Sequence, residues 1–447
     1  MIRRTGLTVL LALLVVAVPA PAGAHGIGGR ADLPVPIEFF LYGAAVVLVV
    51  SFIALALLWP EPRLQGGPRV RVVTAGPIGW PGGVLAAVGV LGLLLVVVAG
   101  LAGVQNSSRN VAPVLVWVDF WLVIPFLGAL FGNLYTYLNP WRTLGAMIGS
   151  EERPALLEHL GVYPAAFALL LFTWLELVQP DSGQPSTVAM AAVVYTASMI
   201  ALMGWAGRST GLQIGDAFTT YNRLISAISP LGRDAQGRLV WRGWIRALPV
   251  LPRWRGLTVF VVLMIGTVSY DGLSSTRWWR DLLGDRAGTL LWETLGFVAV
   301  SAVIGGAYWT ASWAAVKLAN DRRSPAQVAA SFAHTLVPIA LAYAFAHYFT
   351  LVLFEGQLLL STASDPLGQG WDLFGTADRA ISYWMSPTVV WYVQVVSIVA
   401  GHVTGVVLAH DRALAEFPPV RAVRSQYAML VLMVALTALG LTILAAG

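Results

Sequence analysis

Histidines inside apolar segments are the first residues in this sequence whose type and spacing suggest chemistry. Two apolar stretches near the C-terminus, 326–357 and 386–414, carry four of the chain's six histidines. Ionisable side chains are costly inside a bilayer, usually face the interior of a helix bundle or a water-filled cavity, and mark functional sites. We therefore expect function to centre on His334, His347, His402 and His410.

Depth in the membrane groups these histidines into two layers. In the eighth and ninth predicted spans, His334 and His402 each lie seven residues from the inner end. At about 1.5 Å per residue, both rings should lie about 10 Å below the inner surface. Two histidines at one depth on neighbouring helices predict the axial ligands of a single haem. His347 should lie nearer the outer surface, level with Gln394, where a second haem would need a histidine.

Carboxylates from other apolar segments fall at the same outer level as His347. They are Asp119, Glu176, Asp271 and Glu293. Imidazole and carboxylate ligands suit zinc, manganese or copper, and a bound divalent ion lowers the pKa of coordinated water towards neutrality. The pattern predicts a hydrolytic metal site with His347 as the central ligand, Asp119 or Asp271 assisting, and Glu293 as general base. The alternative for each carboxylate is a solvated residue at the membrane boundary.

The N-terminus has the pattern of a secretory signal peptide. Arg3 and Arg4 precede a short apolar run, and small residues at Ala22 and Ala24 suit a cleavage site, which predicts a signal peptide over 1–24. Cleavage would leave His25 as the first residue, outside the cytoplasm. Its amine and ring nitrogen can bind one copper ion, and the alternative is an exposed tail without metal.

Composition places the chain among polytopic membrane proteins. It has 447 residues, of which 57% are hydrophobic and 11% charged, whereas soluble domains average about 25% charged residues. The net charge of +5 reflects cations in short loops between apolar runs, so nothing indicates nucleic-acid binding. The absence of cysteine excludes disulfides, thiolate metal sites and cysteine nucleophiles.

Apolar runs predict ten membrane-spanning helices in a single all-α domain, 25–447. Placing both termini outside puts nineteen of the 27 Lys and Arg residues in inner loops, as expected for a multi-pass protein of the cytoplasmic membrane. The glycines Gly401 and Gly405 should permit close helix packing. The spans are 37–59, 84–104, 112–132, 164–179, 186–206, 257–272, 289–314, 327–354, 386–409 and 426–446.

Three loop features complete the prediction. The basic, tryptophan-rich inner loop 207–256 should lie on the inner membrane surface as an interfacial helix. The outer loop 355–385 is a lid or a surface loop. The sequence HDR at 410–412 should end its helix at the inner surface, where Arg412 complements the helix dipole.

Several phrases carry a family resemblance. They are AHGIGGRADLPVPIEFF, FGNLYTYLNPWR, FAHTLVPIALAYAFAHYF and GHVTGVVLAHDRAL. Together they resemble a family of bacterial multi-span membrane proteins often labelled fenitrothion hydrolase. The resemblance implies hydrolysis of organophosphorus triesters, and it supplies no catalytic signature that can be transferred residue by residue.

Several functions are therefore open at the level of sequence. The leading hypothesis is metal-assisted hydrolysis of lipophilic, organophosphorus-type esters that reach the site through the bilayer. The alternatives are a copper- or proton-linked transporter or binding protein, a single-haem protein, and a subunit of a larger membrane complex. The expected partners are lipid, a lipophilic small molecule or a metal ion, and other membrane subunits. Histidines that only hydrogen-bond between helices are a further alternative.

Overall fold

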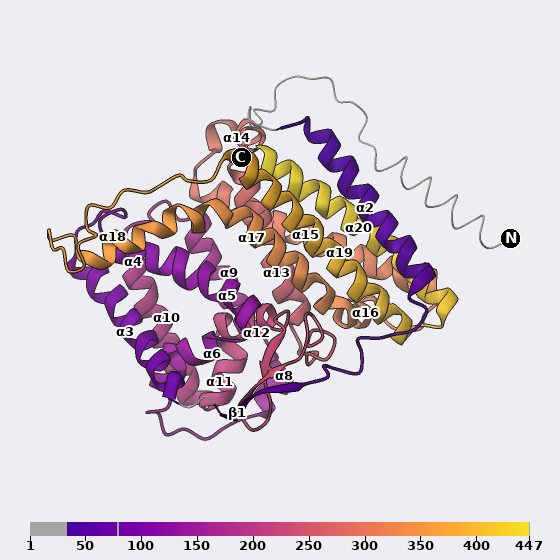
Figure 1. Cartoon of the computed structure of the whole chain (residues 1–447), viewed down its shortest axis with the longest axis horizontal. Helices are drawn as coiled ribbons and strands as arrows, with labels where there is room; N and C mark the ends of the chain where they lie inside the picture. The colour runs from indigo at the N-terminus through magenta and orange to yellow at the C-terminus, as the bar shows by residue number, and fades with distance from the viewer. Residues whose placement is uncertain (1–33, 78–79, 447) are drawn as a thin grey trace.

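Long apolar helices account for most of this computed structural model, which describes residues 34–77 and 80–446 (Figure 1). In that part of the chain, nine helices are long and apolar enough to cross a membrane. They confirm the prediction of an all-α, multi-pass membrane bundle. The signal peptide predicted over 1–24 and His25 lie outside the described residues.

The helices with spanning length form most of the ten predicted spans. They are α2 (Ile37–Leu58), α3 (Trp80–Ala102), the continuous segment α4 (Val111–Val114), η1 (Leu115–Val123) and α5 (Ile124–Phe131), α10 (Pro185–Ala206), α13 (Leu257–Ser274), α15 (Leu290–Ala319), the segment α16 (Pro325–Phe332), η3 (Ala333–Leu336) and α17 (Val337–Leu353), α19 (Pro387–Glu416), and α20 (Pro419–Ala446).

The shorter helix α9 (Tyr163–Leu177) supplies the tenth crossing. Before its first turn, the Val162 amide donates to the Arg255 carbonyl on the side of the basic loop. Beyond its last turn, the Ser182 carbonyl accepts a hydrogen bond from Trp117 Nε1, on the opposite side. Fifteen residues rise about 22 Å, so α9 connects the two sides although it is shorter than the other spans. The described chain therefore begins and ends on the same side of the bundle.

The spans form two halves that meet along a central seam (Figure 1). Helices α3, α5 and α10 lie in one half, and α2, α15, α19 and α20 lie in the other. Helices α9, α13 and α17 run between them, and α17 contacts both α13 and the segment η1. Residues on the seam can therefore interact with both halves.

Glycines set the closest approach between helices. A Cβ atom added at Gly401 of α19 would lie 2.2 Å from Ala342 Cβ and 2.8 Å from the Pro338 carbonyl oxygen of α17. At Gly405 it would lie 3.0 Å from the Thr335 carbonyl oxygen. These distances support the prediction that the two glycines permit close packing.

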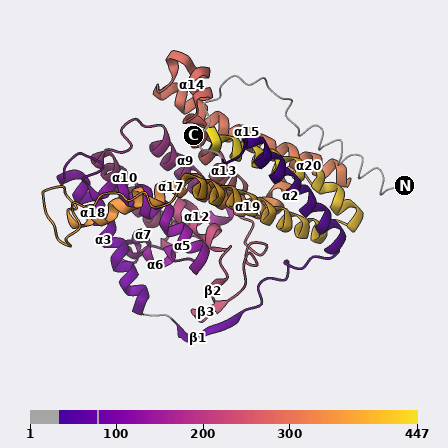
Figure 2. The ribbon, with the colours of Figure 1, turned by 45° about the horizontal axis from the view of Figure 1, so that its top comes forward.

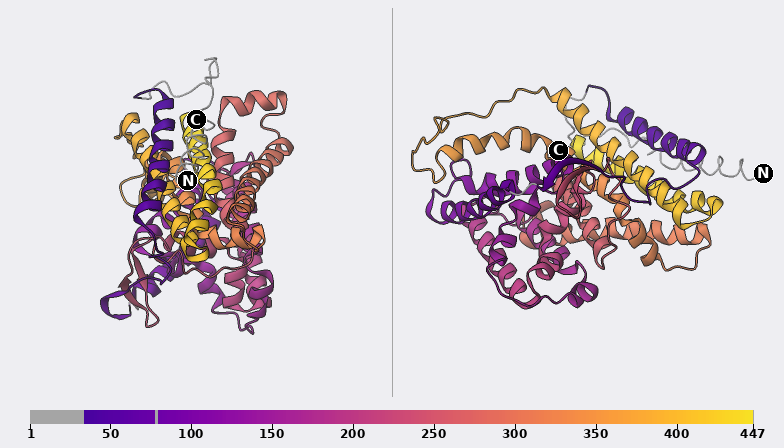
Figure 3. Two further views of the ribbon diagram at one scale, coloured as in Figure 1. Left: turned by 90° about the vertical axis from the view of Figure 1, so that its right-hand side faces the viewer. Right: turned by 60° about the horizontal axis from the view of Figure 1, so that its bottom comes forward.

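The side of the bundle that carries the basic loop, predicted to be the inner side and called so below, has short elements that the sequence did not predict. A small antiparallel sheet has the order β1-β3-β2, with Arg71 opposite Trp241 and Gly232 opposite Val240. Figure 2 and Figure 3 show this sheet at the end of the bundle opposite α14. The strands are β1 (Arg71–Pro77), β2 (Leu231–Arg233) and β3 (Arg238–Trp241), and the short inner helices are α6 (Tyr135–Leu138), α7 (Pro140–Gly145), α8 (Ala155–Leu160), α11 (Arg208–Gly215) and α12 (Ala217–Ser226).

The inner loop 207–256 differs from its prediction. It contains α11 and α12, whose residues are mostly buried against α9 and α5, and the β2–β3 hairpin. Asp216 begins α12 by accepting a hydrogen bond from the Phe218 amide at 3.1 Å, and Asn139 Nδ2 donates to its other oxygen at 2.7 Å. These polar groups find partners inside the protein, and the position of the loop on the membrane surface stays a prediction.

On the outer side, short elements connect the spans. Helix α14 projects from this end of the bundle (Figure 2), and the loop 355–385 begins with two short helical elements. They are α14 (Arg277–Leu283), η2 (Gly284–Arg286), η4 (Glu355–Gln357) and α18 (Leu358–Ser364).

Candidate functional site

A hydrogen-bonded pair, His347 and Asp271, lies on the central seam. His347 Nε2 and Asp271 Oδ2 are 2.9 Å apart and join α17 to α13 near their outer ends. The two side chains keep 18% and 25% of their surface exposed, so other protein groups do not cover them completely. The sequence predicted both residues at one outer level, and the structure brings them into contact.

A second carboxylate extends this pair. Glu176, at the end of α9, interacts electrostatically with Asp271. Its Oε2 atom is buried without a hydrogen bond of standard geometry among the described residues, although the Trp121 side chain interacts with this carboxylate. Tyr348, next to His347, interacts with both carboxylates. We call His347, Asp271, Glu176 and Tyr348 the seam cluster. It joins three helices and contains four groups that can carry or release a proton.

Asp119 lies on an unusual helical segment beside the seam. Residues Leu115–Val123 form a π-helix, in which the Ile124 amide donates to the Asp119 carbonyl. Such segments are rare and occur frequently at functional sites. The Asp119 Oδ2 atom is buried and has no hydrogen-bond partner among the described residues. The structure gives no hydrogen bond or ion pair between the Asp119 carboxylate and the described part of the seam cluster.

The described residues do not bring together enough ligands for a complete metal site. Within 34–77 and 80–446, no group of three or more His, Asp or Glu residues could hold one ion. His347 and Asp271 supply two donors, whereas zinc sites in proteins use three or four protein ligands. His347 and Asp119, two of the predicted metal ligands, make no described contact with each other. His25, the third predicted ligand, lies outside the described residues.

Glu293 has a different position from the one predicted for a general base. Its Oε2 atom accepts hydrogen bonds from Tyr270 Oη at 2.8 Å and from Trp279 Nε1 at 3.0 Å. Its Oε1 atom accepts one from the Gly288 amide at 2.8 Å. Glu293 therefore ties the start of α15 to α13 and α14. Tyr270 connects it to the neighbourhood of Asp271, but Glu293 makes no described contact with His347.

His334 and His402 share some features of haem ligands. In each ring, Nδ1 contacts a backbone carbonyl, that of Ser331 for His334 at 3.1 Å and that of Ile398 for His402 at 2.8 Å. Both Nε2 atoms are buried without a partner among the described residues. A hydrogen bond from Nδ1 is the usual means of orienting a ligating Nε2.

The placement of these two histidines does not fit a shared haem. Close contacts pair Gly401 with Pro338 and Gly405 with Thr335, so His402 lies about one helical turn from the level of His334. The same contacts leave no room for a macrocycle between α17 and α19. The surroundings also differ, because His334 lies near Arg412 and Arg253 whereas His402 has no charged neighbour within the described ranges.

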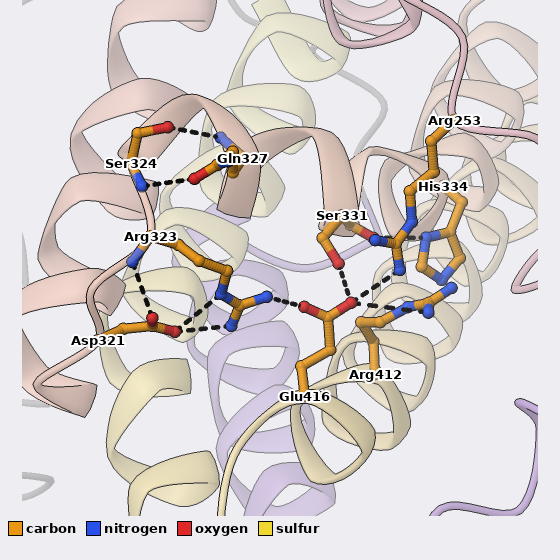
Figure 4. A network of polar contacts seen from close by, with 9 residues as sticks. All are labelled: Arg253, Asp321, Arg323, Ser324, Gln327, Ser331, His334, Arg412 and Glu416. Carbon is orange, nitrogen blue, oxygen red and sulfur yellow. Dashed lines mark hydrogen bonds and ion pairs between the residues drawn. The ribbon is translucent and has the colours of Figure 1, made fainter.

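An ionic network closes the inner end of the bundle beside His334. Figure 4 shows Glu416 at its centre, contacted by Arg323, Ser331 and Arg253. Arg253 Nη2 lies 2.8 Å from Glu416 Oε1, and Arg323 also binds Asp321 at 2.7 Å. The network connects the loop after α15, the end of α19 and the basic loop. Its geometry holds inner segments together.

The sequence HDR has a role that the sequence analysis missed. Helix α19 continues through it to Glu416, and Asp411 is fully buried. Its carboxylate accepts hydrogen bonds from Trp59 Nε1 at 3.2 Å, from the Arg63 and Leu64 amides, and from Gln65 Nε2 at 2.7 Å. The prediction that HDR ends the helix was wrong. The charged triplet itself was the available signal, but its partners lie about 350 residues away.

The fold and the buried polar groups define the class: a multi-pass membrane helix bundle with His and Asp residues inside it. The chain matches none of the family models, curated proteins or solved structures with which it was compared. Any statement about its activity therefore rests on the site itself.

Proposed function

We propose that this protein is a proton-linked membrane transporter whose proton-carrying site is the seam cluster. The observation that carries this proposal is the contact of His347 with Asp271 next to Glu176, a second buried carboxylate. Ionisable groups at such positions mark proton relays in pumps and transporters.

The charges in the cluster support proton exchange. Two neighbouring carboxylates in a medium of low dielectric constant repel each other when both are ionised. A protonated His347 would balance only one of them, so a proton shared within the cluster lowers the repulsion. A proton that enters from the partly exposed pair can then pass to Glu176.

The position of the cluster supports transport. Substrate and coupling-ion sites in many transporters lie between two structural halves that move against each other. Helices α9, α13 and α17 lie between the halves of this protein (Figure 1), and each contributes a residue to the cluster. The transported partner belongs to the classes predicted from the sequence, a metal ion or a lipophilic small molecule.

Proton flux into proteoliposomes tests this proposal. Vesicles carrying a pH-sensitive dye receive a potassium diffusion potential, with and without zinc, manganese or copper ions outside. We expect flux above that of empty vesicles, and a loss of at least tenfold in His347→Gln and Asp271→Asn, because the site then cannot exchange its proton. Flux no greater than in empty vesicles, or full flux in His347→Gln, contradicts the proposal.

A matched control is available in the neighbouring helix. His402 is also a buried histidine, but its only described partner is the Ile398 carbonyl. His402→Gln should retain flux within twofold of the wild type. Size-exclusion elution and thermal unfolding of each variant separate a loss of proton exchange from a loss of the fold.

Hydrolysis of a lipophilic organophosphorus-type ester is a second candidate. The observation that favours it is the same pair, because a carboxylate that orients an imidazole makes a general base. His347 would remove a proton from water, the oxygen would attack phosphorus, and the alcohol or phenol would leave. In this role His347 acts as a base and not as a metal ligand. The predicted metal site of His347, Asp119 and His25 remains a hypothesis, and so does the hydrolase activity that the family resemblance implies.

Release of nitrophenolate from a dialkyl nitrophenyl phosphate distinguishes the two candidates. Hydrolysis by purified protein that disappears in His347→Ala supports the hydrolase, particularly if proton flux is absent. Folded Glu293→Gln should keep the activity if His347 is the base, since the Glu293 oxygens already accept three hydrogen bonds. Loss of activity in folded Glu293→Gln would restore Glu293 as the base.

The location in the cytoplasmic membrane, the signal peptide and copper binding at His25 also remain proposals. N-terminal sequencing of protein purified from membranes tests cleavage after Ala24, and metal analysis of that material tests His25. A visible spectrum tests for haem. We expect no Soret band, because α17 and α19 pack closely between His334 and His402.

A further inference from the structure

A pocket lined by arginines opens at the inner end of the bundle, away from the seam cluster. Its volume is about 290 Å³, and it lies between the end of α5, the helix α12 and the β2–β3 hairpin. Three arginines line it, one from each of three segments: Arg223 from α12, Arg233 from β2 and Arg242 from the loop after β3. No aspartate or glutamate is among its lining residues.

The three positive charges have no acidic partner in the described part of the chain. None of them takes part in an ion pair there. Burial lowers the pKa of the Arg223 and Arg242 guanidinium groups below their usual range. Arg223 and Arg242 are half-buried and Arg233 is exposed. Partial loss of hydration makes an unpaired charge unfavourable, and a bound anion would offset it.

Each guanidinium group is held in place by neutral groups. Arg242 Nε donates to the Ser229 carbonyl at 3.1 Å, and its Nη2 donates to the Ser226 carbonyl. The Arg223 guanidinium lies 4.1 Å from the centre of the Trp254 ring, and that of Arg233 lies 4.7 Å from the centre of the Tyr137 ring.

This arrangement prepares hydrogen-bond donors for an anion. An arginine has five N–H donors in a planar fork that matches phosphate oxygens. Stacking uses the face of the group and leaves its N–H edge available, although Arg233 Nη1 also donates to the Gly237 carbonyl at 3.0 Å. Arg223 and Arg233 are therefore oriented by aromatic rings and keep N–H donors for a ligand.

The remaining walls of the pocket are largely apolar. Three leucines, two alanines and Phe131 line it beside the polar residues Asn133, Thr136 and Ser226. Phe131, at the end of α5, is half exposed. Trp241 and Trp244, which follow in the same loop, are also about half exposed. Exposed tryptophans beside cationic residues are typical of the membrane interface. A ligand that fits this pocket combines a phosphate group with apolar chains.

We propose that this pocket binds the phosphate group of an anionic phospholipid of the inner leaflet. The three arginines bind the phosphate, and the apolar wall around Phe131 accepts the beginning of the acyl chains. The site is separate from the seam cluster and does not depend on the transport proposal.

Binding of soluble short-chain lipids to the full-length protein in a neutral detergent tests this proposal. The probes are dihexanoyl phosphatidylglycerol, dihexanoyl phosphatidylcholine and inorganic phosphate, followed by tryptophan fluorescence and isothermal titration calorimetry. We expect phosphatidylglycerol to bind more tightly than phosphatidylcholine. In Arg223→Gln/Arg233→Gln its affinity should fall at least tenfold. Arg242 is left intact because its hydrogen bonds support the fold.

A variant with the same loss of charge provides the control. Arg69 and Arg246 lie on the inner side outside the pocket, and Arg69→Gln/Arg246→Gln should keep the affinity within twofold. Tight binding of inorganic phosphate that the arginine variant abolishes would support a phosphate site but assign it to a soluble compound. Equal loss of affinity in both double variants, or unchanged binding in Arg223→Gln/Arg233→Gln, would overturn the proposal.

Discussion

Replacing Asp411 should release the chain segment that follows α2. The Asp411 carboxylate accepts hydrogen bonds from Trp59 Nε1, from the amides of Arg63 and Leu64, and from the Gln65 side chain at 2.7 Å. The backbone N–H groups of Arg63 and Leu64 therefore both donate to the buried Asp411 carboxylate, which holds the Arg63–Leu64 peptide bond in place. Trypsin can cleave this bond only after the segment has opened.

The expected magnitude follows from the hydrogen bonds. A hydrogen bond to a charged group contributes about 1.5–3 kcal/mol. In Asp411→Asn the side chain keeps its shape and one acceptor oxygen. We therefore expect it to lose the contribution of two hydrogen bonds to a charged group, about 3 kcal/mol of the free energy of opening this segment. Since each 1.4 kcal/mol is a factor of ten, the open population and the cleavage rate should rise about 100-fold.

Limited trypsin digestion in detergent, followed by mass spectrometry, measures the rate at Arg63. Cleavage after Arg69, whose backbone does not bind Asp411, is the internal reference in the same sample. Asp378→Asn removes an exposed carboxylate of the outer loop and should change neither rate. A rise of less than about fivefold at Arg63 in Asp411→Asn, or an equal rise at Arg69, would refute this account.

Three further substitutions test packing, charge and hydrogen bonding, with thermal unfolding as the measurement. Gly401→Ala should lower stability by about 1–3 kcal/mol through overpacking, whereas Gly43→Ala, where a Cβ atom meets nothing within 4 Å, should not. The hydrogen bond from Arg323 lowers the pKa of Asp321, so this carboxylate stabilises the fold above its unfolded pKa and loses that effect as the pH falls through its folded pKa. Asp321→Asn should therefore lower the unfolding temperature at pH 7 and change it little near pH 3; an equal loss at both would contradict the role of charge. Glu293→Ala leaves the donors of three hydrogen bonds without their acceptor and should cost about 2–4 kcal/mol.

The spanning helices and the outer pair could be predicted because both depend on local sequence. A run of about 20 apolar residues is long enough to cross a bilayer. Counting residues from the span ends then placed His347 and Asp271 at one level. Their contact is 2.9 Å in the structure. The same counting wrongly placed His334 at the depth of His402, because η3 interrupts the helix before Pro338 and α19 continues to Glu416.

The inner side could not be predicted because its partners are distant in sequence. Strand β1 pairs with β3 about 160 residues later, and neither strand is long enough to give a clear pattern. Asp411 finds its donors about 350 residues earlier. The arginine pocket arises only when α12, the hairpin and the end of α5 meet. A basic loop without these contacts resembles an interfacial segment, which is how its composition was interpreted.

The two ends of the bundle differ in a way that bears on how the seam cluster could work. At the inner end, Glu416 binds arginines from separate segments and Asp411 holds the chain after α2, so several loops are fixed to α19. At the outer end, the pair of His347 and Asp271 keeps part of its surface exposed. A site that exchanges protons with one side of a membrane needs one accessible end and one closed end. If the seam cluster exchanges protons as proposed, this arrangement corresponds to an outward-facing state, in which the Glu416 network would have to open to release a proton inwards.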